Sequence, residues 1–371
     1  IVLIPKVQNP EVITQYRPIS LCNVVYKLIS KVLANRLKQI LPEVISPNQS
    51  AFVPGRLITD NVLVAPYECI HAIRRRKKGK NYSCAVKLDM LKAYDRVEWH
   101  YLEATMTKLG FCDKFIRLVM KCVSSVRFTV KVNGTLLPFF TPSRGLRQGD
   151  PYSPFLFLIC AEGFTSLMNY FGGNFVDRGI RVSFRSPWVN HLLFADDSLL
   201  FFKASHEEAL VIKKVLEKFQ RGTGQLLSQA KCSLLFSEHC PVHVQESIKD
   251  TLGVVASSFE SKYLGLPTPD GRMKGEKFQP IMERFVKRCS DWNERYMSHA
   301  AKEVHVKSVA QAVPVFSMSC FKLPRGLCEH LNKLIRKFWW GSKDGQRKPH
   351  WVSWKAMTQP KGMGGLGFKD F

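Results

Sequence analysis

Apolar residues recur at helical spacing in several long stretches of the chain. Such a period of three to four residues is typical of a helix with one buried face. The pattern predicts helices over residues 26–41, 61–82, 97–123, 155–170 and 207–220. Pro42 is expected to end the first helix, and Gly222 and Gly224 the last.

Shorter apolar runs, each of strand length, separate these helices. They cover residues 2–4, 84–88, 192–194, 199–202 and 232–236. A further pair of runs, 128–132 and 135–139, flanks Asn133 and Gly134, a dipeptide that suits a type I′ hairpin turn. The mixture of helices and short strands predicts an α+β protein.

Two adjacent acids, Asp196 and Asp197, separate two of the apolar runs, at the place where a hairpin turn is expected. A third acid, Asp89, closes the run 84–88. If these strand ends lie side by side, Asp89 and Asp196 could share hard cations such as Mg²⁺ for phosphoryl transfer. Taken alone, an Asp pair also fits a solvated turn.

The balance of charge narrows the class of partner. The 371 residues contain 55 Lys and Arg against 30 Asp and Glu, a net charge of +25, which favours a partner with a phosphate backbone. An anionic membrane is the main competing partner, but the sequence contains no clear basic amphipathic helix and no apolar run long enough to span a bilayer.

The cysteines suggest reduced thiols, because their number is odd, 11, and nothing resembles a signal peptide. A zinc site at Cys232, His239, Cys240 and His243 is an alternative, although their spacing fits no usual ligand pattern.

A series of short motifs follows in order along nearly the whole chain. They are Ile4-Pro5-Lys6, Tyr16-Arg17-Pro18-Ile19-Ser20, Gln49-Ser50-Ala51-Phe52, Pro54-Gly55-Arg56, Leu88-Asp89, Ala93-Tyr94-Asp95-Arg96-Val97, Gly145-Leu146-Arg147-Gln148-Gly149-Asp150-Pro151, Phe194-Ala195-Asp196-Asp197, Lys231-Cys232-Ser233 and Tyr263-Leu264-Gly265. In this order they resemble the reverse transcriptase of non-LTR (LINE-type) retrotransposons, in particular those of plants. Since the chain begins at Ile1 without a Met, the resemblance also implies a fragment that lacks the N-terminal endonuclease.

The resemblance implies a right-hand polymerase with an antiparallel palm sheet. Residues 1–270 would form fingers and palm, residues 271–345 a helical basic thumb, and residues 346–371 the start of a tail segment. From residue 271 onward the chain has 20 Lys and Arg against 8 Asp and Glu, which suits a thumb that holds phosphates. The basic run 74–80 could contact nucleic acid or be a solvated loop. The tryptophans at 339, 340, 351 and 354 could stack on bases or pack in a core.

The resemblance also implies the metal site. Asp89, Asp196, Asp197 and the backbone carbonyl of Met90 would hold two Mg²⁺ ions, with Asp196 the principal ligand beside Asp89 and Mn²⁺ an alternative metal. Lys231 would protonate the leaving pyrophosphate, or be a plain surface lysine.

Nucleotide contacts are implied at five further positions. Tyr94 would act as a steric gate against a 2′-hydroxyl, with core packing as its alternative role. Arg17 and Arg56 would grip the triphosphate, and Gln148 and Gly149 would lie beside the nucleotide.

Three other implications complete the site. Asp150 is expected to cap a helix, and Tyr152 stands where the family usually has Leu. The primer grip would be Tyr263, Leu264 and Gly265.

The expected reaction is RNA-templated addition of deoxynucleotides to a DNA primer 3′-hydroxyl, in LINE-type retrotransposition. One metal would lower the pKa of that hydroxyl, and the other would bind the triphosphate and leaving pyrophosphate. The partners would be an RNA template, a DNA primer and dNTPs, and no membrane would be involved. The protein would act in the nucleus and could also pass through a cytoplasmic ribonucleoprotein stage. The alternatives are an inactive RNA-binding remnant, a maturase-like RNA chaperone, and an RNA-templated RNA polymerase. The oligomeric state stays open.

Overall fold

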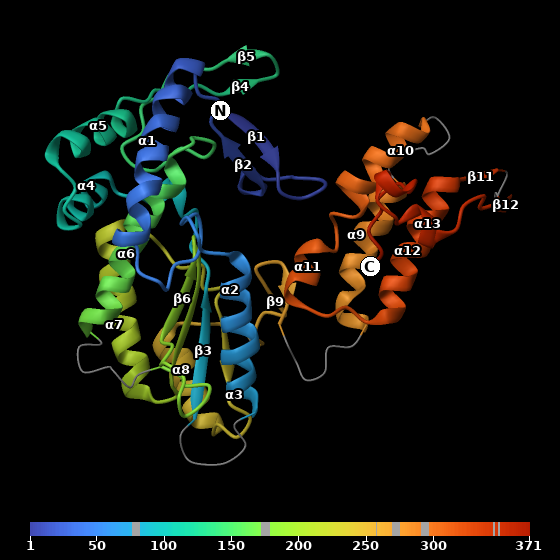
Figure 1. Ribbon diagram of the computed structural model, residues 1–371. Helices are drawn as coiled ribbons and strands as arrows, with labels where there is room; N and C mark the ends of the chain where they lie inside the picture. Colours follow the sequence, from blue (N-terminus) through green and yellow to red (C-terminus); the bar gives the residue numbers. More distant parts are fainter. Residues whose placement is uncertain are drawn as a thin grey trace. The chain divides into compact units, whose positions relative to one another are not determined.

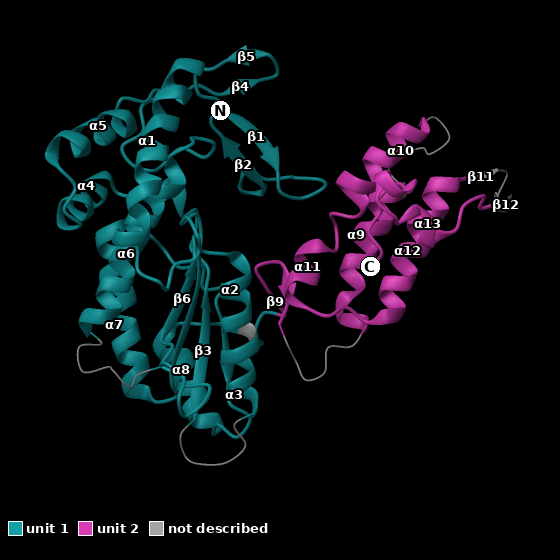
Figure 2. Cartoon of the chain, in the orientation of Figure 1, with its two compact units in different colours: residues 1–260 teal, residues 261–371 magenta. Residues whose placement is uncertain are grey.

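The computed structural model describes residues 1–75, 82–171, 179–256, 258–268, 275–290, 297–343, 346–347 and 349–371. These residues form two compact units, Ile1–Glu260 and Ser261–Phe371 (Figure 2). Residues 270 and 271 and residue 345 lie outside the described residues, so the predicted boundaries at 270/271 and 345/346 stay predictions. None of the described helices combines the length and the apolar character needed to cross a membrane.

A four-stranded antiparallel sheet organises the first unit, in the order β6-β7-β3-β8. Its strands are β3 (Ser83–Leu88), β6 (His191–Phe194), β7 (Asp197–Lys203) and β8 (Ser233–Phe236). The runs expected to be strands at 84–88, 192–194, 199–202 and 232–236 are thus confirmed. Every residue of β3 is buried, which explains why its sequence is almost continuously apolar.

Helices cover both faces of this sheet. On one side α2 (Ile58–Val62), a π-helical segment (Leu63–Ile70) and α3 (His71–Arg75) form one continuous helical stretch, and on the other side lie α6 (Ser153–Phe171) and α7 (His206–Thr223) (Figure 1). Helices α6 and α7, together with α8 (Val242–Leu252), pack on Val86, Leu200 and Phe202 of the sheet. The remaining helices of this unit are α1 (Val24–Val44), α4 (Trp99–Lys108) and α5 (Asp113–Ser124).

Two small hairpins complete the first unit. One pairs β1 (Val2–Pro5) with β2 (Tyr16–Ile19), and the other pairs β4 (Lys131–Val132) with β5 (Thr135–Leu136). Asn133 and Gly134 have φ of 49° and 89°, the positive values that a type I′ turn requires, so the predicted turn is confirmed.

Three predicted helix bounds are wrong. The first helix continues through Pro42 to Val44, and the Arg56 side chain bonds to carbonyls at and after its C-terminus. The predicted helix 97–123 is two helices, because Gly110 adopts φ 84° and ends α4 before α5 begins. The predicted helix 61–82 begins at Ile58, and the part of the basic run 74–80 that follows Arg75 lies outside the described residues.

The second unit is mainly helical. It contains β9 (Lys262–Tyr263), β10 (Leu266–Pro267), α9 (Gln279–Ser290), α10 (His299–His305), a π-helical segment (Val306–Ala310), α11 (Val315–Cys320), α12 (Arg325–Trp340), β11 (Ser342–Lys343), β12 (Gln346–Arg347) and α13 (Trp354–Met357). Its core gathers Phe285, Leu331, Ile335, Phe338 and Trp339. Trp339 therefore has the core role, whereas Trp351 is 81% exposed.

Candidate active site

The sheet brings the three predicted acids together. Leu88, the last residue of β3, pairs with Ser198, so Asp89 emerges beside Asp197, the first residue of β7. Asp196 occupies the two-residue turn between Phe194 and Asp197. Asp89 is close enough to raise the pKa of Asp196. Two chain segments more than a hundred residues apart thus place their carboxylates at one end of the sheet.

Burial, with repulsion from neighbouring acids, raises the pKa of Asp196 and of Asp197. The pKa of Asp196 is raised mainly by burial and further by Asp89, while its own backbone N–H and Lys231 lower it in part. The pKa of Asp197 is raised to about 6, again first by burial, although Lys87 opposes the shift. A cation at this position would therefore be favoured, because it would stabilise the ionised forms.

Two lysines supply positive charge to the site. The Nζ of Lys231 lies 3.6 Å from Oδ1 of Asp89, and the Lys231 side chain is 69% exposed. Lys87, which is only 7% exposed, forms an ion pair with Glu260 and lowers the pKa of Asp197. No role for Lys87 was predicted from the sequence. Its signal was available, since it is the one charged residue inside the apolar run 84–88.

The donor chemistry suits a hard divalent cation. Asp89 and Asp196 offer carboxylate oxygens, which Mg²⁺ prefers. Met90 lies opposite Leu227, but the backbone bonds of this pairing are made by its neighbours: the Leu91 N–H donates to the Leu226 carbonyl, and the Asp89 carbonyl accepts from the Ser228 N–H. The Met90 carbonyl is therefore not used in that pairing. Within the described ranges, no three His, Cys, Asp or Glu side chains are arranged to hold a metal, and this applies also to the candidate zinc residues near Cys232. The same holds for the predicted set Asp89, Asp196 and Asp197, so a metal held by these carboxylates stays a proposal.

Tyr94 lies next to the acidic pair. Its ring stacks on Phe157 of α6 with the centroids 4.9 Å apart and the planes within 8°. Burial raises the pKa of the Tyr94 hydroxyl to about 12, and Asp196 adds to this rise. The tyrosine is therefore packed against the core and still borders the carboxylates, so both of its predicted roles are compatible with this geometry.

The loop 145–149 is held close to two neighbouring backbones by its glycines. A Cβ on Gly145 would lie 2.8 Å from the Asp95 carbonyl oxygen, and one on Gly149 would lie 3.1 Å from that of Ser20. Both glycines have positive φ, 92° and 101°. The carbonyl of Gln148 accepts a bond from the Ser20 N–H at 2.8 Å. Only glycine allows so close an approach in this conformation.

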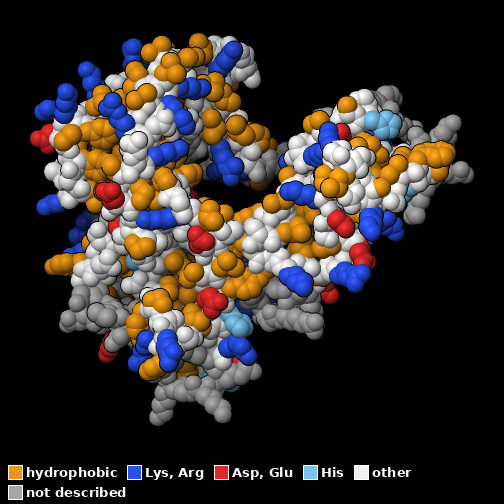
Figure 3. Space-filling model, viewed as in Figure 1, with side chains coloured by type: hydrophobic (Ala, Val, Ile, Leu, Met, Phe, Trp, Pro, Cys, Tyr) orange, Lys and Arg blue, Asp and Glu red, His pale blue; other side chains and the backbone are white. Residues whose placement is uncertain are grey.

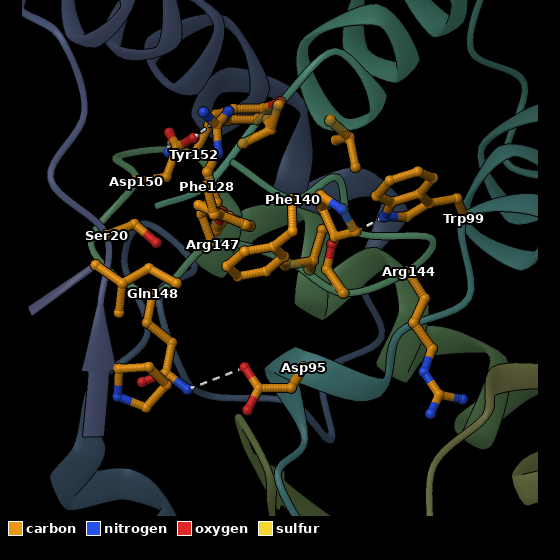
Figure 4. A pocket seen from close by; sticks show the side chains of 18 residues that line it. Ser20, Asp95, Trp99, Phe128, Phe140, Arg144, Arg147, Gln148, Asp150 and Tyr152 are labelled. Atoms are coloured by element: carbon orange, nitrogen blue, oxygen red, sulfur yellow. Dashed lines mark hydrogen bonds and ion pairs between the residues drawn. The ribbon is translucent and has the colours of Figure 1, made fainter. Parts of the chain in front are cut away.

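A cavity of about 240 Å³ opens beside Gln148 (Figure 4). Trp99, Phe128 and Phe140 contribute aromatic surface to its lining. Gln148 Nε2 and Asp95 Oδ1 face one another at 3.5 Å. Asp95 thus lies beside a side-chain amide at the wall of this cavity.

Asp150 links α1 to the start of α6. Its carboxylate accepts from the Tyr26 hydroxyl at 2.8 Å, pairs with Arg147 at 2.8 Å, and accepts more weakly from the Tyr152 N–H at 3.4 Å. Its stronger bonds are thus to Tyr26 and Arg147, and its bond to Tyr152, the residue before α6, leaves the helix-capping role a prediction. Tyr152, which replaces the usual Leu, is fully buried.

The two predicted triphosphate arginines have different surroundings. Arg56 donates to the carbonyls of Ser46 at 2.6 Å, Gln49 at 2.7 Å and Ile45 at 2.7 Å. These bonds satisfy the chain after the C-terminus of α1 and commit the guanidinium to it. The geometry therefore gives Arg56 a structural role, and its predicted contact with the triphosphate stays a prediction. Arg17 is exposed on β2.

The predicted primer grip belongs to the second unit. Residues 262–267 form the hairpin of β9 and β10, in which Tyr263 is buried. Leu264 and Gly265 have φ of 49° and 81°, so both turn positions are left-handed. These residues thus form a tight turn, and their function as a primer grip stays a prediction.

A short segment between α1 and α2 holds the strand that leads into the acidic turn. The Leu193 N–H donates to the Asn48 carbonyl at 2.8 Å, and the Ser50 N–H donates to the Leu193 carbonyl at 3.1 Å. Between these bonds, Gln49 is buried, and its Oε1 accepts from the Ala195 N–H at 3.0 Å. The sequence analysis assigned no role to Gln49, because a glutamine in a loop carries no signal of burial.

Comparison with known proteins places this geometry in a family context. Residues 4–268 match the family model described as reverse transcriptase (RNA-dependent DNA polymerase). The uncharacterized 149 kDa protein of transposon TX1 from Xenopus laevis is 26% identical over 98% of this chain and 27% of its own length. The retrovirus-related Pol polyprotein from the type-2 retrotransposable element R2DM of Drosophila melanogaster is 25% identical over 77% of this chain and 27% of its own length.

The chain thus spans about a quarter of the length of these two relatives. Among solved structures, apo telomerase from Candida tropicalis is similar with a TM-score of 0.44 and 13% identity, over 85% of this chain and 54% of the other.

Proposed function

The chain belongs to the reverse transcriptase family, and from this premise we propose that it is an RNA-directed DNA polymerase that adds deoxynucleotides to a primer 3′-hydroxyl. One observation carries the proposal: Asp89 and Asp196 meet at one end of the sheet, with Tyr94 bordering them. This is the arrangement that metal-assisted phosphoryl transfer requires, and the reaction needs no nucleophile from the protein.

Asp89 and Asp196 would hold two Mg²⁺ ions, with Mn²⁺ as an alternative metal and with Asp197 and the Met90 carbonyl as weaker ligands. A metal held there would lower the pKa of the primer hydroxyl and neutralise charge on the triphosphate. Lys231, 3.6 Å from Asp89 and well exposed, can release its ion pair and give a proton to the departing pyrophosphate.

Selection of the nucleotide falls to Tyr94 and the loop 145–149. The Tyr94 ring is fixed against Phe157, so a sugar beside it would find a rigid wall where a 2′-hydroxyl projects. Gln148 and Gly149 would lie against the template–nucleotide pair, and the flat aromatic lining beside Gln148 suits a base. Arg17, exposed on β2, is available to contact the triphosphate.

The template would be RNA and the primer DNA. Figure 3 shows Lys and Arg side chains spread over both units, with fewer Asp and Glu among them. A net charge of +25 supports binding to phosphate backbones. The resemblance to non-LTR elements supports retrotransposition in a plant nucleus, with the endonuclease on another part of a longer protein, the second unit as the thumb, and Tyr263, Leu264 and Gly265 as the primer grip.

Primer extension on an RNA template tests this function. Wild type is expected to give a Mg²⁺-dependent DNA product, and Asp196→Ala to reduce it about a thousandfold or more while RNA binding is retained. Asp250→Ala removes an exposed carboxylate from α8 and serves as the matched control. Equal product from wild type and Asp196→Ala would support the inactive RNA-binding alternative. Equal use of ribonucleotides and deoxynucleotides by wild type would support an RNA polymerase.

A further inference from the structure

Ala195 holds a backbone conformation that its side chain disfavours. It has φ 54°, in the left-handed region that glycine adopts freely and alanine does not. It is also the first of the two turn residues between Phe194 and Asp197, directly before Asp196. In a two-residue hairpin turn this position commonly carries Gly or Asn. Something outside the turn must therefore stabilise it.

The bond from Gln49 supplies that stabilisation. Gln49 Oε1 accepts from the Ala195 N–H at 3.0 Å and from the Ala51 N–H at 3.0 Å. The Gln49 side chain is only 1% exposed, so these bonds do not compete with water. Its backbone position is fixed as well, because the bonds of Asn48 and Ser50 to Leu193 align the segment with β6.

The nitrogen of the Gln49 side-chain amide also indicates that the oxygen of this side chain stabilises the turn. In the part of the chain that the structure describes, Gln49 Nε2 is buried without a hydrogen-bond partner. An unpaired buried donor lowers stability, so packing alone would favour an apolar side chain of similar length. The acceptor oxygen is the part of Gln49 that has a use here.

We propose that Gln49 is a positioning residue of the polymerase site: its side-chain oxygen holds the Ala195 turn, and through the turn it places the Asp196 carboxylate. This inference rests on the proposed function. The Gln49 side-chain oxygen bonds to the backbone N–H groups of Ala195 and Ala51, so its effect on the reaction would pass through the backbone of Ala195 and Asp196. A small displacement of a catalytic carboxylate is enough to lower a rate strongly.

Gln49→Met removes the acceptor and keeps the length of the side chain. We expect kcat of primer extension to fall about ten- to a hundredfold, while KM for the dNTP changes less than about threefold. Asn48→Leu is the matched control, because it removes the bond from Asn48 Nδ2 to the His191 carbonyl at 2.8 Å on the same strand without touching the turn. Its kcat is expected to stay within about threefold of wild type.

A second substitution tests whether the effect passes through Ala195. Glycine adopts positive φ without steric cost, so Ala195→Gly should restore at least about a third of the lost activity in the Gln49→Met background. Equal losses in Gln49→Met and Asn48→Leu, or no gain from Ala195→Gly, would refute the positioning role.

Amide hydrogen exchange gives a readout that needs no activity. The Ala195 N–H should exchange slowly in wild type and in Asn48→Leu, and at least about tenfold faster in Gln49→Met. If wild type extends no primer, the proposed function fails, and exchange still decides whether Gln49 holds the turn. Unchanged exchange at Ala195 in Gln49→Met would overturn the inference in either case.

Discussion

His191 makes the stability of the first unit depend on pH. It opens β6, the strand that leads to Asp196, and its side chain is only 1% exposed. Its ring nitrogens lie 2.8 Å from Asn190 Oδ1 and 3.2 Å from Thr165 Oγ1, and neither partner is a carboxylate. Burial lowers the pKa of His191 from 6.5 to about 4. We predict that His191→Gln removes most of the resulting loss of stability in acid.

The size of the effect follows from the difference between the two pKa values. Above pH 6.5 the imidazole is neutral in both the folded and the unfolded chain, and the contribution to stability is complete. Below that pH the unfolded chain binds the proton first, so stability falls until the pH reaches the folded pKa of about 4. A difference of about 2.5 pH units corresponds to roughly 3 kcal/mol lost across this window.

Urea unfolding measured at about pH 7 and about pH 4.5 tests this prediction. His191→Gln should be less stable than wild type at the higher pH, but the difference should shrink by about 2–3 kcal/mol at the lower pH. His243→Gln, an exposed histidine on α8, is the control and should follow wild type at both values. Parallel curves for wild type and His191→Gln would refute the assignment of the acid sensitivity to this ring.

Three other substitutions test separate features of the site. Tyr94→Val removes the wall fixed on Phe157 and should raise ribonucleotide use roughly tenfold or more in primer extension; an unchanged ratio would contradict the steric gate. Arg56→Met should lower the free energy of unfolding by about 2–4 kcal/mol, because it leaves backbone carbonyls after α1 unpaired. A drop in nucleotide affinity without loss of stability would instead support the predicted contact of Arg56 with the triphosphate. Gly145→Ala should destabilise by about 2–3 kcal/mol through its contact with Asp95, whereas Gly134→Ala, with similar φ and open space, should lose only about 1 kcal/mol; equal losses would exclude the contact as the cause.

Local patterns were sufficient for the elements that carry the acids. The apolar run 84–88 and the runs around Asp196 formed strands, and Asn133 with Gly134 formed the expected turn. These predictions needed only periodicity and the chemistry of turns. The meeting of Asp89 with Asp196 was inferred from the order of motifs, since no local pattern specifies which strands pair.

Tertiary contacts decided the features that the sequence analysis missed. Pro42 did not end α1, and Arg56, which is 14 residues from Pro42 in sequence, bonds to carbonyls at and after the end of that helix. Gly110 divided a stretch whose apolar period continues across it. Gln49 and Lys87 acquired their roles only by burial beside the acidic turn, which depends on the packing of distant segments.

The two lysines near the acids differ greatly in their access to reagents. Lys231 is 69% exposed, whereas Lys87 is 7% exposed and occupied by Glu260. A small acylating reagent should therefore modify Lys231 in the folded chain and reach Lys87 only after unfolding. Mass spectrometry of the two labelled peptides would then report occupancy of the site and integrity of the sheet in the same sample, without any mutation.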